Sequence, residues 1–265
     1  MLALCSCVAV VSAQKRIWLD KDLAWTDSVE AVSYAMVRNV SDVCTVVDVY
    51  ALDSIKLFTE YYSVYVSDPK KRIRNGLFRA YYSDGTDSLT INYVNNIPEG
   101  ESVAYYKGGQ KHFVYVYKNG RQVVMRQYYP DGNLRREEFY KKDGTIKEGR
   151  VYAEDGTELQ FEPYVIRPDF PGGAASFLKS LNQYIRYTKE MVKAGLEGKV
   201  KVCFLIKEDG TMTDFRIQES AHYLLDREAI LALMRMAQNY KWNPGRIDGK
   251  PMCMEESATV TFYTK

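Results

Sequence analysis

Residues 198–217 decide the fold of the C-terminal part of the chain and read GKVKVCFLIKEDGTMTDFRI. Apolar residues occupy every second position from Val200 to Ile206, and Phe215 and Ile217 continue the alternation after the Glu-Asp-Gly-Thr sequence. Alternation with a period of two indicates a strand with one buried face, and an Asp-Gly pair favours a tight turn. The stretch therefore predicts a β-hairpin.

A helical pattern precedes the hairpin. Apolar residues recur at three- and four-residue intervals over residues 174–187, which predicts a helix with one apolar stripe. A second, short helix is expected over residues 189–194, and Gly195 would end it as a C-cap.

A further helix and a strand follow the hairpin. The helix is expected to open at Leu225, with Asp226 and Glu228 in its first turn, where negative charge is favourable against the helix dipole. The last strand is expected over residues 257–263, where apolar side chains alternate with Thr and Tyr. Helix, hairpin, helix and strand predict a two-layer α+β sandwich with its helices on one face of an antiparallel sheet.

Several short motifs occur in a fixed order along this part of the chain. They are Phe-Pro-Gly-Gly at 170–173, Gly-x-Val-x-Val-x-Phe at 198–204, Asp-Gly-Thr at 209–211, Leu-Asp-x-Glu-Ala at 225–229, Trp-x-Pro-Gly at 242–245 and Gly-Lys-Pro at 249–251. Their order and spacing resemble the C-terminal domain of TonB energy-transducer proteins of the Bacteroidetes type, over residues 161–265. The family commonly has Tyr-Pro where this chain has Tyr187-Thr188, which predicts that the segment from Tyr184 to Thr188 sits differently here.

The resemblance implies a binding function. The family binds an extended peptide, the TonB box of a TonB-dependent outer-membrane receptor, by adding it as a strand to a sheet edge, where N–H and C=O groups are unpaired. By analogy, the partner-binding residues are Ser257, Ala258, Thr259, Val260, Thr261, Phe262 and Tyr263 on the last strand, with Tyr184, Arg186 and Tyr187 before the short helix. The alternative is that this edge is covered by the N-terminal region or by a second copy of the chain in a homodimer.

Turn sequences recur at regular spacing in the N-terminal region. Gly120, Gly132, Gly144 and Gly156 are twelve residues apart, and each follows Asn or Asp, as in two-residue hairpin turns. About ten residues of aromatic and charged alternation separate the turns, which predicts a meander of short antiparallel strands. The pattern resembles the MORN-like repeats of the YwqK family and is clearest over residues 77–159.

The remainder of this region is less informative. One unit has Asn95-Asn96 in place of a turn glycine, and residues 14–76 contain strand-like stretches that specify no chemistry. We therefore expect one β-rich region over residues 14–160. Its sheet is either a recognition surface for a protein, a lipid head group or a glycan, or a spacer that its tyrosines hold together.

The first thirteen residues are apolar or small and carry no charge. A membrane-spanning helix needs about 20 apolar residues, and the stretch ends Val11-Ser12-Ala13, the small-x-small form of a signal-peptidase site. We expect residues 1–13 to be a signal peptide that directs the chain to the periplasm. Two alternatives stay open: Leu4-Cys5-Ser6-Cys7 loosely resembles a lipoprotein attachment site, and a start codon further upstream would make the segment an inner-membrane anchor.

Nothing in the sequence suggests catalysis. Neither His112 nor His222 stands in a pattern with metal-site or triad spacing. Outside the leader, Cys44, Cys203 and Cys253 show no C-x-x-C spacing; Cys203 and Cys253 could pair across a sheet, but free thiols are favoured. With 36 basic and 34 acidic residues, the net charge of +2 gives no case for nucleic acid. We therefore predict no enzyme and no catalytic, metal or cofactor site.

Together these patterns predict an α+β protein, with an N-terminal antiparallel β-meander and a C-terminal sandwich. The predicted function is that of a TonB-family periplasmic protein that binds TonB-dependent outer-membrane receptors and supports energy-coupled nutrient transport. Contact with the inner-membrane proton-driven motor is not expected, because it requires a membrane helix. The alternative is a non-transducing envelope scaffold or recognition protein that uses the repeat sheet, with the TonB-like module for docking or dimerisation.

Overall fold

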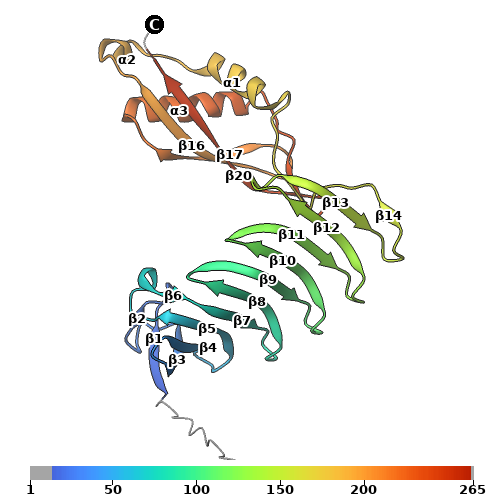
Figure 1. The fold of residues 1–265 in the computed structure, drawn as a ribbon. Helices are drawn as coiled ribbons and strands as arrows, with labels where there is room; N and C mark the ends of the chain where they lie inside the picture. The colour runs from blue at the N-terminus through green and yellow to red at the C-terminus, as the bar shows by residue number, and fades with distance from the viewer. Residues whose placement is uncertain (1–13, 264–265) are drawn as a thin grey trace, which may run out of the picture. The chain divides into compact units, whose positions relative to one another are not determined.

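The computed structural model describes residues 14–263, so the leader expected over residues 1–13 lies outside the described part. The chain divides into two compact units, Met1–Phe161 and Glu162–Lys265. Each unit is described separately (Figure 1).

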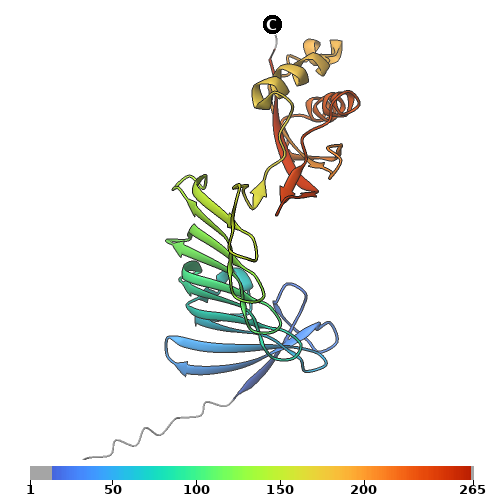
Figure 2. The same ribbon diagram turned by 90° about the vertical axis from the view of Figure 1, so that its right-hand side faces the viewer.

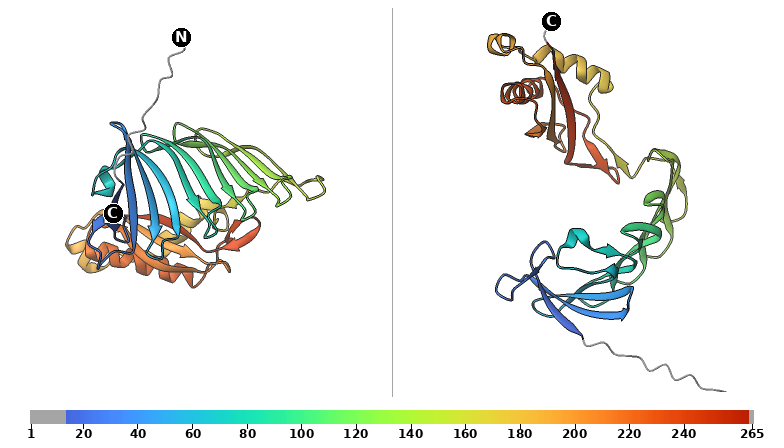
Figure 3. Two further views of the ribbon diagram at one scale, coloured as in Figure 1. Left: turned by 90° about the horizontal axis from the view of Figure 1, so that it is seen from below. Right: turned by 60° about the vertical axis from the view of Figure 1, so that its left-hand side comes forward.

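The N-terminal unit is built on one antiparallel sheet. Its strands are β1 (Lys15–Leu19), β2 (Trp25–Thr26), β3 (Ser33–Ser41), β4 (Cys44–Ala51), β5 (Lys56–Val64), β6 (Ile73–Arg74), β7 (Gly76–Tyr81), β8 (Asp87–Val94), β9 (Ile97–Tyr105), β10 (Lys111–Lys118), β11 (Arg121–Tyr128), β12 (Leu134–Tyr140), β13 (Ile146–Tyr152) and β14 (Glu158–Leu159). From β3 to β14 neighbouring strands follow chain order, apart from the short β6, which pairs with β5 beside β7; β1 pairs with β3 and β2 covers part of β1 (Figures 1 and 3). The predicted β-meander is confirmed, and it begins well before residue 77.

The hairpin turns of this sheet lie at the predicted positions, but of the predicted glycine turns only Asn119-Gly120 has the two-residue form with positive φ at both residues; at the Asp-Gly turns of this sheet the glycine alone has a positive φ. At the turn after β11, the Tyr129 amide donates to the Asn133 carbonyl at 2.9 Å, and Asp131 Oδ1 accepts from the Asn133 amide at 2.9 Å. Gly132 in this turn has φ +91°, a region that residues with a Cβ rarely adopt. Asn95 and Asn96 adopt φ values of +50° and +68°, so two asparagines replace the turn glycine at that position.

Tyrosine hydroxyls tie alternate hairpins together along one end of the sheet. Each donates to a backbone carbonyl two strands further on: Tyr82 to Tyr105 at 2.6 Å, Tyr106 to Tyr128 at 2.9 Å and Tyr129 to Tyr152 at 2.9 Å. The next equivalent position is Ala153, which has no hydroxyl. The twelve-residue glycine spacing therefore corresponds to one strand and its turn, whereas the hydrogen-bonded unit is a pair of strands.

Buried carboxylates recur in the same sheet with the same partners. Glu60 and Glu138 are 3% and 1% exposed. Each accepts a hydrogen bond from the tyrosine two residues later, Tyr62 or Tyr140, and burial together with the nearby carboxylate raises the pKa of both hydroxyls. The arginines Arg74 and Arg136 balance the carboxylate charges at 2.8 and 3.3 Å. A Glu-aromatic-Tyr unit in β5 therefore repeats the arrangement of β12.

The C-terminal unit is the predicted two-layer α+β sandwich. Its elements are β15 (Val165–Ile166), α1 (Gly173–Tyr184), α2 (Lys189–Lys193), β16 (Gly198–Ile206), β17 (Met212–Glu219), α3 (Tyr223–Ala237), β18 (Gly245–Ile247), β19 (Lys250–Met252) and β20 (Met254–Phe262). One sheet has the order β17-β16-β20 and a smaller one the order β15-β18-β19. Figure 2 shows the helices in yellow and orange, with β20 in red.

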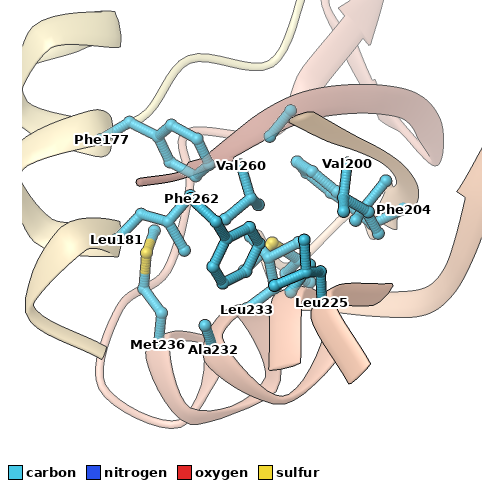
Figure 4. Packing of buried hydrophobic residues seen from close by; sticks show 14 of the residues in the cluster. Phe177, Leu181, Val200, Phe204, Leu225, Ala232, Leu233, Met236, Val260 and Phe262 are labelled. Carbon is cyan, nitrogen blue, oxygen red and sulfur yellow. The ribbon is translucent and has the colours of Figure 1, made fainter. Parts of the chain in front are cut away.

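Both long helices pack against the same face of the larger sheet. Figure 4 shows Phe177 and Leu181 of α1 and Leu233 of α3 meeting Val260 and Phe262 of β20. Because the register pairs Val200 with Val260, the alternate apolar residues of β16 and β20 lie on one face. The period-two pattern of the sequence therefore marks the core.

The β16–β17 turn is hydrogen-bonded to the loop before β18. Gly210 accepts from the Trp242 amide at 2.9 Å, and a Cβ at Gly210 would collide with the Trp242 carbonyl oxygen. Hydrogen bonds from the Thr211 hydroxyl and amide, helped by Lys241 at 3.3 Å, lower the pKa of Asp209 to about 2. Asp209 therefore stays ionised at neutral pH and holds this turn.

Replacing Phe204 by alanine tests the packing of this unit. Phe204 is fully buried and its ring lies 5.8 Å from that of Trp242 and 6.5 Å from that of Phe177. We expect Phe204→Ala to lower the free energy of unfolding of the C-terminal unit by about 3–5 kcal/mol, measured by urea denaturation. Leu178→Ala is the control, since Leu178 is half exposed on α1. An equal effect of both changes would contradict this core.

Candidate partner-binding edge

One side of β20 is free for pairing. β20 pairs with β16 in a continuous register, from Met254 opposite Ile206 to Phe262 opposite Gly198. In the part of the chain that the structure describes, β20 has no strand on its other side. A regular strand nine residues long therefore presents backbone groups that no strand pairs at this edge, although the Glu255 carbonyl accepts from Arg167 at 2.9 Å.

The opposite edge of the same sheet is irregular. The pairing of β17 with β16 shifts register between Lys201 and Val202 and again between Cys203 and Leu205. Asp214 within β17 has φ +54°, which interrupts the extended backbone. Bulges of this kind twist an edge and disfavour the addition of another strand. Of the two edges, β20 is therefore the better acceptor.

The predicted residues on this strand divide into two sets. The side chains of Ala258, Val260 and Phe262 are buried in the core, so only their backbone can meet a partner. Ser257, Thr259 and Tyr263 are exposed and Thr261 is half-buried; Tyr263 follows the end of β20. The sequence pattern missed the first three residues of the strand, among which Glu255 pairs with Arg216 and Glu256 with Arg167.

The predicted helix over residues 174–187 is too long, because α1 ends at Tyr184. Ile185 is extended, with ψ 126°. Glu228 of α3 accepts from the Arg186 amide at 2.7 Å and from Arg235 at 2.7 Å, and Arg235 donates to the Tyr184 carbonyl at 2.8 Å. These contacts take the backbone groups that a longer helix would use.

This arrangement also corrects the role expected for Glu228 at the helix dipole. Its side chain is 4% exposed and points to the α1–α2 connection. The start of α3 lies earlier than predicted, at Tyr223, and His222 is its N-cap, with Nδ1 accepting from the Leu224 amide at 3.3 Å. Asp226 instead binds the Ser220 hydroxyl and the Ala221 amide.

Thr188 replaces the proline of the Tyr-Pro pattern without moving the backbone away from the conformation that proline favours. Its φ of −73° and ψ of 158° lie in the range available to proline. Its hydroxyl accepts from the Met191 amide at 3.3 Å and so caps α2. The departure at residue 188 therefore supplies a cap for α2.

A hollow of about 650 Å³ lies beside the end of β20. Its lining joins the last strand to the α1–α2 connection and consists of Asn182, Ile185, Tyr187, Val192, Thr261, Phe262 and Tyr263. Of the predicted partner-binding residues, Tyr187 thus lies with the end of β20, its ring 6.2 Å from that of Phe262. Tyr184 packs on Tyr240 at 6.4 Å, and neither it nor Arg186 lines the hollow.

Within residues 14–263, no group of three His, Cys, Asp or Glu side chains is placed to hold a metal ion. Cys44, Cys203 and Cys253 are free, and Cys203 Sγ lies 3.1 Å from Gln218 Oε1. His112 stacks on Tyr106 with the ring centres 4.1 Å apart. None of the helices between residues 14 and 263 is long and apolar enough to cross a membrane.

Removing the Glu228 carboxylate tests how the connection is held. Glu228→Ala leaves Arg235 and the Arg186 amide without their acceptor, so we expect a loss of about 3 kcal/mol in the free energy of unfolding. Amide chemical shifts of Ile185, Arg186 and Tyr187 should change as well. Glu190→Ala, on the exposed side of α2, should alter stability by less than about 0.5 kcal/mol. Unchanged shifts in Glu228→Ala would show that the carboxylate does not position this segment.

Comparison with known proteins finds a family match within this unit. Residues 183–264 match the family model for the C-terminal of the Gram-negative bacterial TonB protein. Among solved structures, the NMR structure of the Helicobacter pylori TonB C-terminal domain is 26% identical, over 36% of this chain and 87% of that chain, with a TM-score of 0.28. A crystal structure of the GtfA/B complex bound to UDP and GlcNAc is 14% identical, over 33% of this chain and 22% of that chain, with a TM-score of 0.23.

No curated protein matches the chain. The family match falls on the elements from the end of α1 to the end of β20, which include both the free edge and the Glu228 contacts. A TonB C-terminal domain is a non-enzymatic domain of transport and protein interaction. Residues 183–264 of this chain therefore match the TonB C-terminal family.

Proposed function

We propose that the C-terminal unit binds an extended peptide of a TonB-dependent outer-membrane receptor as an added strand along β20, in the periplasm. The observation that carries this proposal is the unbroken register of β20 on β16, which leaves a straight row of backbone groups that no strand of the described chain pairs on the other side. Main-chain pairing supplies affinity with little demand on the sequence of the peptide. The family match to the TonB C-terminal supports the choice of partner.

The exposed side chains of β20 suit an added strand. Ser257 and Thr259 are small, polar and exposed, so they offer no steric barrier along the sheet surface. Glu255 and Glu256, by contrast, are held in ion pairs by Arg216 and Arg167 at the start of the strand. The accessible part of the edge therefore begins near Ser257. Support of energy-coupled nutrient transport is the wider role that this binding would serve.

A peptide with blocked amides tests strand addition directly. The peptide carries the TonB box of an outer-membrane receptor and is made in two forms, with N-methyl groups on its odd or on its even residues. Because an added strand uses the amides of alternate residues on one side, one form should bind at least about tenfold more weakly, since it loses several hydrogen bonds of about 1 kcal/mol each. Amide shifts should concentrate at Ser257 to Phe262.

The irregular edge is the internal control, and amides of Phe215 to Glu219 should not respond. Equal binding of both N-methylated forms, or shifts confined to β17, would refute addition at β20. Binding that maps to residues 14–161 would instead favour the alternative of an envelope recognition protein that uses its repeat sheet.

A further inference from the structure

The hollow beside the end of β20 combines an apolar lining with exposed apolar side chains. Val192 and Tyr263 are 57% and 65% exposed, although both line a concave surface. Ile185 and Phe262 complete the apolar part, and Asn182 and Thr261 add polar groups. The volume of about 650 Å³ falls within the ~300–1,000 Å³ of typical ligand pockets.

The hollow continues the free edge of β20. Thr261, Phe262 and Tyr263 are consecutive residues at the end of this edge, and all three line the hollow. Phe262 packs in the core on the helix side of the sheet. Asn182 of α1 and Val192 of α2 belong to the same lining. A strand added along β20 would therefore direct every second side chain to the helix side, and one of these would meet the hollow.

One basic residue lies on the same side of α2 as the hollow. Lys189 lies three residues before Val192 and so shares its side of the helix, whereas Lys193 lies three residues after Glu190, on the side of that acidic residue. Both lysines are exposed, and within residues 14–263 neither forms an ion pair. An acidic residue in the ligand would complement Lys189.

We propose that the hollow is the selectivity site of the edge: it receives one large apolar side chain of the added peptide, next to an acidic residue of the same peptide. This inference rests on strand addition at β20. Backbone pairing alone accepts many sequences, and the hollow selects among them. A shift of the peptide by one residue would turn the apolar side chain to the other face of the sheet.

Designed peptides test the selection with the full chain. The probe is a short synthetic peptide of alternating threonine and valine, in which each position in turn is changed to phenylalanine or to alanine. At one position, phenylalanine should bind at least about tenfold more tightly than alanine, which corresponds to burial of one aromatic side chain. At the positions directly before and after it the two residues should bind equally, because those side chains face the other side of the sheet.

Three protein variants and one peptide change localise the effect. Val192→Ser should lower the preference for phenylalanine by at least about threefold, whereas Val165→Ser, at a similarly exposed valine of β15, should leave it unchanged. An aspartate placed beside the phenylalanine should bind about twofold to fivefold more tightly than asparagine, as for an exposed ion pair, and Lys189→Ala should remove this gain.

The outcomes distinguish the proposed role of the hollow from strand addition at the edge of β20. Peptides that shift the amides of Ser257 to Phe262 but show no preference for phenylalanine at any position would overturn the role of the hollow and leave strand addition intact. A preference that Val192→Ser does not change would also overturn it. Peptides that shift none of these amides would overturn both proposals.

Discussion

The continuous pairing of β20 with β16 is the constraint on which the C-terminal unit depends. It places the buried side chains of both strands on one face, where α1 and α3 cover them. The same regular pairing leaves the other side of β20 straight, since a bulge on one side of a strand would bend both of its sides. Core and candidate binding edge are therefore two consequences of one unbroken register.

The sheet edges of the two units differ in how they are protected against pairing with another strand. The long N-terminal sheet ends in the two-residue strands β2 and β14, and each covers only part of its neighbour. Its last long strand, β13, carries charged residues such as Lys147, Glu148 and Arg150, which discourage pairing with another chain. In the C-terminal unit, β17 is bulged. From Ser257 to Phe262, β20 has neither a bulge nor a charged side chain. An edge left open among protected ones is consistent with binding.

The sequence predicted those features that depend on local period. The alternation from Val200 to Ile206 predicted the hairpin and the core face, and the Asn-Gly and Asp-Gly spacing predicted the meander and the positions of its turns. Each of these depends on residues a few positions apart. The tyrosine hydrogen bonds that join every second strand of the N-terminal sheet were not predicted, because the Tyr129 hydroxyl donates to a carbonyl 23 residues away.

Features set by distant contacts could not be predicted in the same way. The end of α1 at Tyr184 depends on Glu228, which lies 42 residues from its Arg186 partner. Glu228 was assigned to the helix dipole because a carboxylate at its position in the expected first turn is also compatible with that role. The hollow likewise could not be predicted from the sequence, because its lining combines the end of the last strand with residues before and on α2.

The position of Glu228 explains why a buried charge is useful at this point of the fold. Replacing a buried ion pair by apolar residues is often neutral or stabilising, so its presence is weak evidence for stability. Here the carboxylate binds a backbone amide as well as Arg235, and thereby fixes Arg186 and its neighbours Ile185 and Tyr187. Those neighbours line the hollow at the end of β20. Affinity from the edge and selectivity from the hollow need a fixed relative position, and an apolar pair could not hold the backbone in it.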